Sequence, residues 1–315
     1  MELMIETQDL SKYYSSRKKH PAISGLNLNI PKGALYGLIG PDGAGKTTML
    51  RILATVIRQS SGNAQVAGFD VRKEAGKVRA VIGYMPQAFS LYGDLSVIEN
   101  LNFFANINGV PAERRKKRID KLLDFARLDR FRKSHSDHLS GGMRKKLALA
   151  CALIHEPQVL LLDEPTTGVD PVSRRELWLI LAEVIQQGVT VLVTTPYMDE
   201  AERCSQVSII SGGEILTSGS PAEMEASLPF EVLEVKARPR RVFRKVIENP
   251  NGSSGVLRWR PVGDRIRLSA PNLKKTKNWV RSELNTAGAE IDICRQAKTT
   301  MEDVFIHLVT TRQES

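Results

Sequence analysis

Short apolar runs and amphipathic stretches alternate along the first two thirds of the chain. The runs are four to six residues long and rich in leucine or β-branched side chains, which predicts buried parallel strands at 34–39, 81–85, 159–162 and 189–193. Residues 47–57 and 174–187 instead repeat apolar side chains at helical spacing. Strands alternating with helices predict an α/β fold with a mostly parallel core sheet.

A helical insertion is expected between the second and third of these strands. Residues 91–137 follow a helical pattern with a turn at Gly109 to Pro111, and the apolar stripe behind the turn consists of Ile119, Leu122, Leu123 and Ala126. An antiparallel hairpin is expected over 209–216, after which Gly219 to Pro221 break the pattern. We therefore predict a first domain over residues 1–228, with a helical subdomain at about 91–137.

Residues 229–315 differ from the first domain in pattern and in charge. Short alternating runs and two helical stretches predict a small α+β domain. This segment holds 17 Lys and Arg against 10 Asp and Glu, whereas the first 228 residues hold 28 against 25. Such an excess attracts anionic surfaces, either the cytoplasmic membrane leaflet or nucleic acid, although a merely solvated face is the commoner explanation.

The length, composition and apolar pattern of the chain exclude several classes of protein. With 315 residues, 42% hydrophobic and 25% charged, the chain is an average globular protein, which excludes disordered, collagen-like and coiled-coil classes. The longest uncharged stretch, 184–198, is too short to span a bilayer, and the N-terminus lacks the pattern of a signal peptide. We expect a cytosolic chain with three reduced cysteines that match no metal-ligand spacing, Cys151, Cys204 and Cys294.

A glycine-rich sequence links the first predicted strand to the first predicted helix. It satisfies the phosphate-binding pattern G-x-x-x-x-G-K-[ST] with Gly40, Pro41, Asp42, Gly43, Ala44, Gly45, Lys46 and Thr47, and Thr48 follows. Glycines let backbone N–H groups converge on phosphate oxygens, and the helix N-terminus adds the positive end of its dipole. We expect Lys46 to reach the terminal phosphates and the Thr47 hydroxyl to ligate Mg²⁺.

The phosphate-binding loop alone leaves kinases, GTPases, helicases and transport ATPases open as classes of protein. A carboxylate pair further along the chain adds information. Asp163 and Glu164 stand at the carboxyl end of the third predicted strand, where ligands bind in open α/β sheets. We expect Asp163 to hold Mg²⁺ through water and Glu164 to polarise the water that attacks the γ-phosphate.

A second candidate anion site precedes the helix predicted for residues 144–154. Ser140, Gly141 and Gly142 offer a hydroxyl and two backbone amides at a helix N-terminus. A lone Ser-Gly-Gly is usually only a helix cap. Its position just before the strand that carries Asp163 is what suggests a function.

With these motifs in this order, the chain resembles the nucleotide-binding subunits of ATP-binding cassette (ABC) transporters over about residues 5–228. The resemblance implies a P-loop NTPase cassette that binds ATP and Mg²⁺. It assigns Gln87, in the Q-loop, to Mg²⁺ or the attacking water, Asp170 to the D-loop, and Tyr14 to stacking on adenine. Tyr13 is adjacent, so simple packing stays open for either tyrosine.

The resemblance also implies partners. In this family two cassettes sandwich two ATP molecules, each between one subunit's P-loop and the other's signature, which here is Leu139 to Met143. We therefore expect a second cassette, in a homodimer or a heterodimer, and a membrane-spanning permease subunit driven through the helical insertion. The ending Thr299 to Leu308 resembles export ATPases of the drug-resistance and polysaccharide type, which pair with ABC-2 type membrane subunits.

These inferences predict the ATPase subunit of an exporter, peripheral on the inner face of the cell membrane. Two alternatives stay open. One is a non-transport ABC ATPase that acts on nucleic acid or ribosomes through the basic C-terminal segment. The other is a largely regulatory ATP-binding cassette. A single cassette without a long coiled coil argues against the first, so we do not expect a nucleic-acid partner.

One position departs from the family pattern. The family has a histidine that contacts the γ-phosphate at the end of the strand predicted for 189–193, and this chain has Pro196. Proline offers neither a side-chain donor nor an N–H. We predict a degenerate site on this P-loop, paired with a competent site on a second cassette, or else a slow homodimer; Thr194 or Thr195 could substitute for the histidine.

Overall fold

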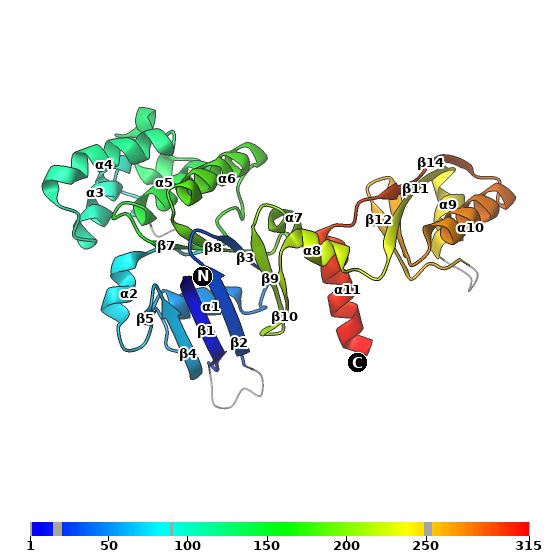
Figure 1. Cartoon of the computed structure of the whole chain (residues 1–315). Helices are drawn as coiled ribbons and strands as arrows, with labels where there is room; N and C mark the ends of the chain where they lie inside the picture. Colours follow the sequence, from blue (N-terminus) through cyan, green and yellow to red (C-terminus); the bar gives the residue numbers. More distant parts are fainter. Residues whose placement is uncertain (1, 15–20, 89–90, 249–253, 315) are drawn as a thin grey trace. The chain divides into compact units, whose positions relative to one another are not determined.

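The chain divides into two compact units, Met1–Pro221 and Ala222–Ser315 (Figure 1). The computed structural model describes residues 2–14, 21–88, 91–248 and 254–314. The division falls a few residues before the predicted end of the first domain, because nearly all of helix α8 (Pro221–Ala226) belongs to the second unit. There Glu225 forms an ion pair with Lys298 at 3.0 Å.

The predicted parallel strands form the core sheet of the first unit. In spatial order they are β10 (Glu214–Gly219), β9 (Gln206–Ser211), β3 (Leu35–Ile39), β8 (Thr190–Thr195), β7 (Val159–Asp163) and β6 (Ile82–Met85). All neighbours pair in parallel except β9 and β10, which form the expected hairpin. The α/β class is therefore confirmed, and the carboxyl ends of β3, β7 and β8 meet at one edge.

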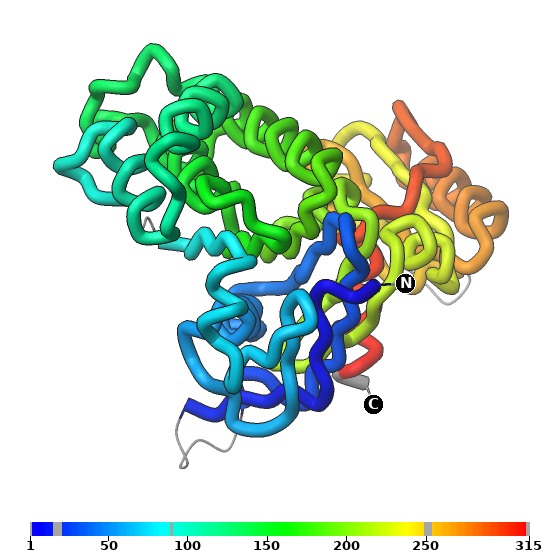
Figure 2. Tube along the Cα trace, turned by 60° about the vertical axis from the view of Figure 1, so that its left-hand side comes forward, coloured from blue at the N-terminus to red at the C-terminus, as the bar shows by residue number. Residues whose placement is uncertain are grey.

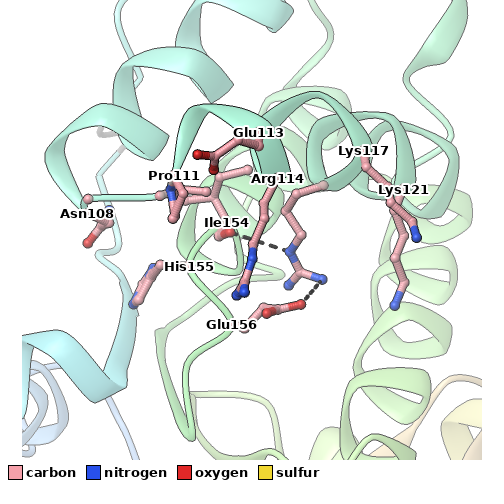
Figure 3. A pocket seen from close by; sticks show the side chains of 12 residues that line it. Asn108, Pro111, Glu113, Arg114, Lys117, Lys121, Ile154, His155 and Glu156 are labelled. Atoms are coloured by element: carbon pink, nitrogen blue, oxygen red, sulfur yellow. Dashed lines mark hydrogen bonds and ion pairs between the residues drawn. The ribbon is translucent and has the colours of Figure 1, made fainter.

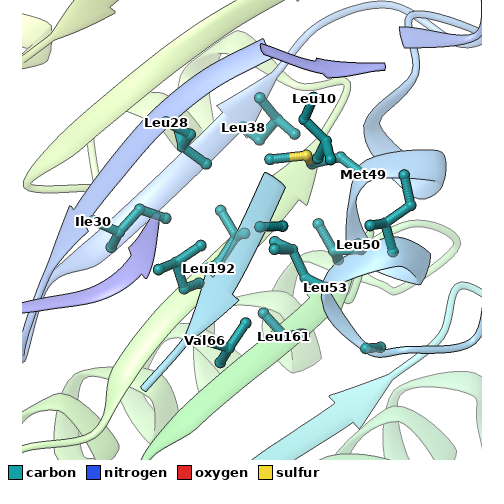
Figure 4. Packing of buried hydrophobic residues seen from close by; sticks show 14 of the residues in the cluster. Leu10, Leu28, Ile30, Leu38, Met49, Leu50, Leu53, Val66, Leu161 and Leu192 are labelled. Carbon is teal, nitrogen blue, oxygen red and sulfur yellow. The ribbon is translucent and has the colours of Figure 1, made fainter. Parts of the chain in front are cut away.

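A second, antiparallel sheet covers residues to which no strand was assigned from the sequence. Its order is β2 (Ile23–Pro31), β1 (Leu3–Lys12), β4 (Ser61–Val66) and β5 (Phe69–Asp70). Side chains from β1, β2 and β4 join others from the core sheet and α1 in one buried cluster, which includes Leu10, Leu28, Leu38, Leu50 and Leu192 (Figure 4). This shared core fixes α1 against both sheets, because removing the apolar side chains from water is favourable only while helix and sheets stay packed together.

Helix α1 (Lys46–Leu53) is shorter than the helix predicted over 47–57. The helix ends because Thr55 adopts a positive φ of 60°, outside the helical range. Ile57 still packs against the core cluster, which explains its place in the apolar pattern. Helix α2 (Ala75–Val81) follows β5 and leads directly into β6.

The helical insertion contains α3 (Val97–Ile107), α4 (Ala112–Phe125) and two single 3₁₀ turns at Asp129–Phe131 and Ser136–His138. Ser96 and Glu99 form a capping box at the start of α3, and all four residues of the predicted apolar stripe are buried. Helices α5 (Gly141–Ala152), α6 (Pro171–Gln186) and α7 (Met198–Ala201) complete the unit. Figure 2 shows α3 to α6 gathered away from the strands of residues 3–31.

The second unit is a β-α-β-β-α-β arrangement, as in ferredoxin-like folds. Its elements are β11 (Glu231–Arg238), α9 (Arg240–Glu248), β12 (Arg258–Val262), β13 (Arg265–Ala270), α10 (Leu273–Thr286) and β14 (Glu290–Ala297), followed by α11 (Met301–Glu314). The sheet order is β12-β13-β11-β14, with every pair antiparallel. Phe243, Val280 and Leu284 from α9 and α10 pack on one face of this sheet.

None of the helices in the described ranges combines the length and the apolar character needed to cross a bilayer.

Candidate active site

The P-loop connects β3 to α1 at the edge where the strands of the core sheet end. Gly43 and Gly45 have positive φ angles of 77° and 107°, a backbone conformation that favours glycine. A Cβ on Gly45 would lie 2.6 Å from the carbonyl oxygen of Ala22, so glycine is required there for space as well. The loop thus folds tightly and delivers Lys46 as the first residue of the helix.

Lys46 is buried, and its ammonium group has three close neighbours besides the carboxylate of Asp42, which lies 3.9 Å away. Nζ donates to the carbonyl oxygens of Gly40 at 2.8 Å and Pro41 at 3.1 Å, and lies 3.2 Å from Oε1 of Glu164. These contacts hold the lysine over its own loop. They also join the P-loop to the carboxylate predicted to activate water.

Asp163 ends β7 beside the P-loop. Its Oδ1 accepts hydrogen bonds from Thr47 Oγ1 at 3.0 Å and from Thr194 Oγ1 at 2.9 Å. Its Oδ2 is buried and has no hydrogen-bond partner among the described residues. Burial raises the pKa of Asp163 above its ordinary value, and the two hydroxyls only partly oppose this.

The environment of Asp163 fits a divalent cation. A buried carboxylate oxygen without a partner is costly, and a bound cation would satisfy it. The hydroxyl of Thr47 is a second hard oxygen on the same side. No group of three or more His, Cys, Asp or Glu side chains in the described ranges could hold a metal by itself. Mg²⁺ usually keeps waters and substrate phosphates as ligands, so a single carboxylate and a hydroxyl would suffice as its protein ligands.

Glu164 is buried, and several groups bind its carboxylate. Besides Lys46, Gln87 Nε2 donates to Oε2 at 2.8 Å and Thr167 Oγ1 donates at 3.2 Å. Its backbone φ of 50° is unusual for a residue other than glycine, and its N–H donates to Oγ1 of Thr194 at 3.0 Å. The structure therefore brings the Q-loop glutamine, the P-loop lysine and the glutamate into direct contact.

Lys145 belongs to this cluster but was not singled out from the sequence. Its Nζ donates to the carbonyl oxygens of Gln87 at 3.0 Å and Glu164 at 3.5 Å. Burial lowers the pKa of this lysine from its ordinary value. The sequence contains one signal that could have identified it: a pair of lysines precedes the apolar sequence Leu-Ala-Leu-Ala. Charged side chains on a buried helix need partners, so such a lysine is expected to contact polar groups.

The signature and the D-loop form a second cluster at two adjacent helix N-termini. Ser140 caps α5 by accepting from Met143 N at 3.3 Å, and Asp170 caps α6 by accepting from the backbone of Val172 and Ser173. Gly142 lies so close to α6 that a Cβ would be 2.3 Å from Ser173 Oγ. Both capping residues are exposed, so this cluster presents Ser140 and Asp170 at the surface.

Tyr14 lies near the start of α1. Its hydroxyl is 3.2 Å from Thr48 Oγ1, the residue is 55% exposed, and Lys12 Nζ lies 5.6 Å from the ring centroid. The backbone N–H of Tyr13 bonds instead to Ser60 at 3.0 Å. The structure thus places Tyr14, rather than Tyr13, against the residue that follows the P-loop.

Pro196 directly follows β8, and the two preceding threonines have other partners. Thr194 Oγ1 contacts Asp163, and Thr195 Oγ1 donates to Oε2 of Glu200 at 2.6 Å. Of the five histidines, His20 lies outside the described residues. In the described ranges, no histidine contacts Lys46, Asp163 or Glu164 by a hydrogen bond or ion pair.

A hollow of about 570 Å³ lies on the helical subdomain (Figure 3). One side is α4, which contributes Arg114, Lys117, Arg118 and Lys121, and the other side is residues 154–156, which follow α5. Arg118 donates to the carbonyl oxygen of Leu153 at 2.7 Å and pairs with Glu156. Four cationic side chains and two acidic ones, Glu113 and Glu156, therefore line the hollow, which we call the cationic hollow.

Comparisons with known proteins extend the resemblance found in the sequence. Residues 23–167 match the family model described as ABC transporter. The chain is 42% identical to the probable multidrug ABC transporter ATP-binding protein YbhF of Escherichia coli (strain K12), over 98% of this chain and 52% of that protein. The chain thus spans about half the length of that relative.

Two further comparisons cover the other protein almost completely. The daunorubicin resistance ATP-binding protein DrrA3 of Streptomyces coeruleorubidus is 36% identical, over 96% of this chain and 95% of that protein. The dimeric post-hydrolysis structure of the ATP-binding cassette MJ0796, bound to ADP and Pi, has a TM-score of 0.64 and 27% identity. The matched region covers 69% of this chain and 98% of the MJ0796 chain.

Proposed function

Because the chain belongs to the ABC transporter family of ATP-binding proteins, we propose that it binds MgATP and hydrolyses it to drive export through a separate membrane-spanning subunit. One observation gives the main support for this proposal. Glu164 contacts both Lys46 and Gln87, and Thr47 contacts Asp163 beside them. Export is supported by relatives whose names state drug resistance or Nod factor export.

The residues of the cluster would have different roles in ATP binding and hydrolysis. The P-loop amides and Lys46 would bind the phosphates, and Tyr14 would stack on the base. Asp163, Thr47 and Gln87 would hold Mg²⁺, which neutralises phosphate charge when bound. Glu164 would accept the proton of the attacking water.

Lys46 would connect nucleotide binding with the hydrolysis step. In the described structure its ammonium is shared between two carbonyl oxygens and Glu164. Terminal phosphates carry more negative charge than one carboxylate, so they compete for the same ammonium. We infer that nucleotide binding draws Lys46 from Glu164 and leaves Oε1 able to act as a base.

The second cluster would complete the site of another cassette. Ser140 and Asp170 are exposed and are bonded to their own helices, whereas Lys46 and Glu164 are bonded to each other. Exposed helix N-termini are available to bind anions supplied from outside. This arrangement supports a head-to-tail pair in which the signature of one cassette closes over the P-loop of the other.

Pro196 favours an asymmetric pair over a slow homodimer. Each threonine hydroxyl has one hydrogen, and the hydroxyls of Thr194 and Thr195 donate to Asp163 and Glu200. Neither is therefore free to replace the donor of the missing histidine. The partner cassette would then need its own histidine, and this chain would supply its signature to that competent site.

The cationic hollow is the proposed contact for the membrane subunit. It lies on the helical subdomain, which the family uses to pass motion to its partner. Arg114, Lys117 and Lys121 line one helix face at the spacing of successive turns. Their charge favours an acidic segment of that partner.

The first test is nucleotide binding and turnover of the purified chain. We expect radiolabelled ATP to bind with Mg²⁺, and Lys46→Ala to weaken binding at least about 100-fold, because a buried charge contact is lost. Lys32→Ala removes an exposed lysine and serves as the control. Failure to bind ATP, or turnover indifferent to Lys46→Ala, contradicts the proposal.

The asymmetric pair needs a test in the assembled transporter. Ser140→Ala, in a reconstituted complex with the membrane subunit and the second cassette, should lower the ATPase rate, because it damages the competent site. An unchanged rate would exclude this model. A purified homodimer with turnover sensitive to Lys46→Ala would favour the slow-homodimer alternative.

A further inference from the structure

We propose that Glu200 is a positioning residue for ATP hydrolysis. Its buried carboxylate holds together the loop after Glu164, the end of β8 and the first turns of α6. This inference rests on the proposed ATPase activity and adds to it a residue outside all the motifs described above.

Glu200 lies in α7, is fully buried and has four side-chain donors around it. Oε2 accepts from Thr166 Oγ1 at 3.0 Å and Thr195 Oγ1 at 2.6 Å. Oε1 accepts from Arg174 Nε at 2.6 Å and Trp178 Nε1 at 3.3 Å. A buried carboxylate is tolerated only where it is paired and hydrogen-bonded, so the position of each donor depends on this one group.

Two donors lead directly to the residues of the candidate active site. Thr166 lies two residues after Glu164, in the loop that continues to Asp170. Thr195 follows Thr194, which contacts both Asp163 and the Glu164 backbone. The carbonyl oxygen of Thr195 also accepts from Gly40 N at 3.3 Å, at the start of the P-loop.

The other two donors lead to the D-loop helix. Arg174 lies one turn after Asp170 on α6, and its backbone N–H donates to the carbonyl oxygen of Asp170 at 2.9 Å. Trp178 follows one turn later on the buried side of the helix. A single carboxylate thus joins the carboxylate pair and the P-loop to the helix whose exposed start presents Asp170.

The segment after Pro196 depends on the same group. Tyr197 N donates to Thr195 Oγ1 at 3.1 Å, and the Arg174 guanidinium lies 4.7 Å from the centre of the Tyr197 ring. Thr195 and Arg174 are both held by Glu200. Pro196 has no N–H to donate, so these contacts, together with the hydrogen bond from Glu200 N to the carbonyl oxygen of Tyr197 at 3.3 Å, hold the chain just beyond β8.

The test compares Glu200→Gln with Asp199→Asn in the full chain. The two acids are adjacent in α7 and both contact Arg174, but Asp199 does so at 3.2 Å with its side chain 74% exposed. Single-turnover hydrolysis with protein in excess measures the chemical step, equilibrium binding measures MgATP affinity, and amide hydrogen exchange measures local opening. Thr166→Val and Thr195→Val each remove one donor and cover the case in which Glu200→Gln fails to fold.

We expect Glu200→Gln to slow hydrolysis about 10- to 100-fold while MgATP affinity changes less than threefold, because small displacements of positioned groups cost rate more than binding. Exchange should accelerate in 164–174 and 194–200 but not in the P-loop. Each valine variant should show a smaller change of the same kind, and Asp199→Asn should stay within twofold of the wild type. Glu200→Asp should recover part of the rate.

Two results would overturn the inference. One is unchanged hydrolysis and exchange in Glu200→Gln or, if that variant does not fold, in both valine variants. The other is equal loss of binding and hydrolysis with faster exchange throughout the chain, which marks a purely structural role. If the wild type alone shows no turnover, exchange confined to the two named segments decides the role of Glu200. Turnover that is indifferent to Lys46→Ala would instead contradict the proposed function.

Discussion

Asp163 shows how a single residue of the candidate active site can weaken the fold that carries it. Its carboxylate is buried, one oxygen has no partner among the described residues, and burial raises its pKa. A carboxyl whose pKa is raised on folding binds its proton more tightly in the folded state. The free energy of unfolding therefore falls as the pH rises from the ordinary pKa through the raised one.

Asp163→Asn should stabilise the metal-free chain at pH 7. The amide keeps an oxygen for Thr47 and Thr194 but carries no charge, so we expect a gain of about 1 kcal/mol, equivalent to a few degrees in Tm. The gain should shrink as the pH falls toward 3.8, the ordinary value, because the carboxyl becomes neutral there. Thermal melting across this pH range checks this expectation, with the exposed Asp124→Asn as control. A lower Tm for Asp163→Asn at pH 7 would contradict it.

Pro196 is the second residue with a separate prediction. We expect Pro196→His to raise the ATPase rate of the purified chain by about 10- to 100-fold, because it restores a donor at the end of β8. Steady-state turnover measures this, and the same substitution combined with Lys46→Ala is the control. An unchanged rate would show that a missing partner, rather than the missing donor, limits turnover.

At the scale of elements, the contact between α5 and α6 determines where the signature stands. Gly142 in α5 has no room for a side chain, since Ser173 of α6 lies where its Cβ would be. Gly141, its neighbour, has only the carbonyl oxygen of Gly168 at 3.6 Å. The two successive glycines therefore differ: Gly142 permits close packing of the helices, whereas Gly141 has room for a Cβ at ordinary contact distance.

Gly142→Ala should therefore destabilise the protein, while Gly141→Ala should not. We expect a loss of about 1–3 kcal/mol for Gly142→Ala, the usual cost of overpacking. Ser173→Gly in the same chain should recover most of it, because the clashing atoms are removed. Urea unfolding followed by circular dichroism measures these differences, and equal stabilities for the two alanine variants would exclude the explanation.

At the scale of the whole molecule, the two units have separate hydrophobic cores. One core lies between the sheets and α1 of the first unit, and the other lies between the sheet of the second unit and α9 and α10. All the residues proposed to bind ATP lie in the first unit. The ferredoxin-like unit is therefore expected to affect stability independently of nucleotide affinity.

Leu284→Ala tests this separation. Leu284 is fully buried in the second core, so its truncation should cost about 2–5 kcal/mol in that unit. The affinity for MgATP should stay within twofold of the wild type, with exposed Lys274→Ala as the control. Fluorescent-nucleotide titration and hydrogen exchange check the two parts, and a parallel loss of affinity would show that the units are energetically coupled.

The sequence by itself determined the features that are local in the chain. The P-loop is a run of eight residues whose conformation follows from its own glycines and from the strand and helix beside it. The parallel strands and the apolar stripe of the insertion follow from periodicity. The resemblance placed Gln87 and Asp170, whose functional roles stay predictions.

Tertiary structure alone decided which distant side chains meet. Thr194 contacts Asp163 across 31 positions, Thr166 contacts Glu200 across 34, and Lys145 reaches Gln87 across 58. No periodicity encodes such pairs, because a pattern says which face of an element is apolar but not which polar atoms lie opposite one another. The antiparallel sheet escaped assignment for a related reason: its strands are defined by pairing with partners far away in the chain.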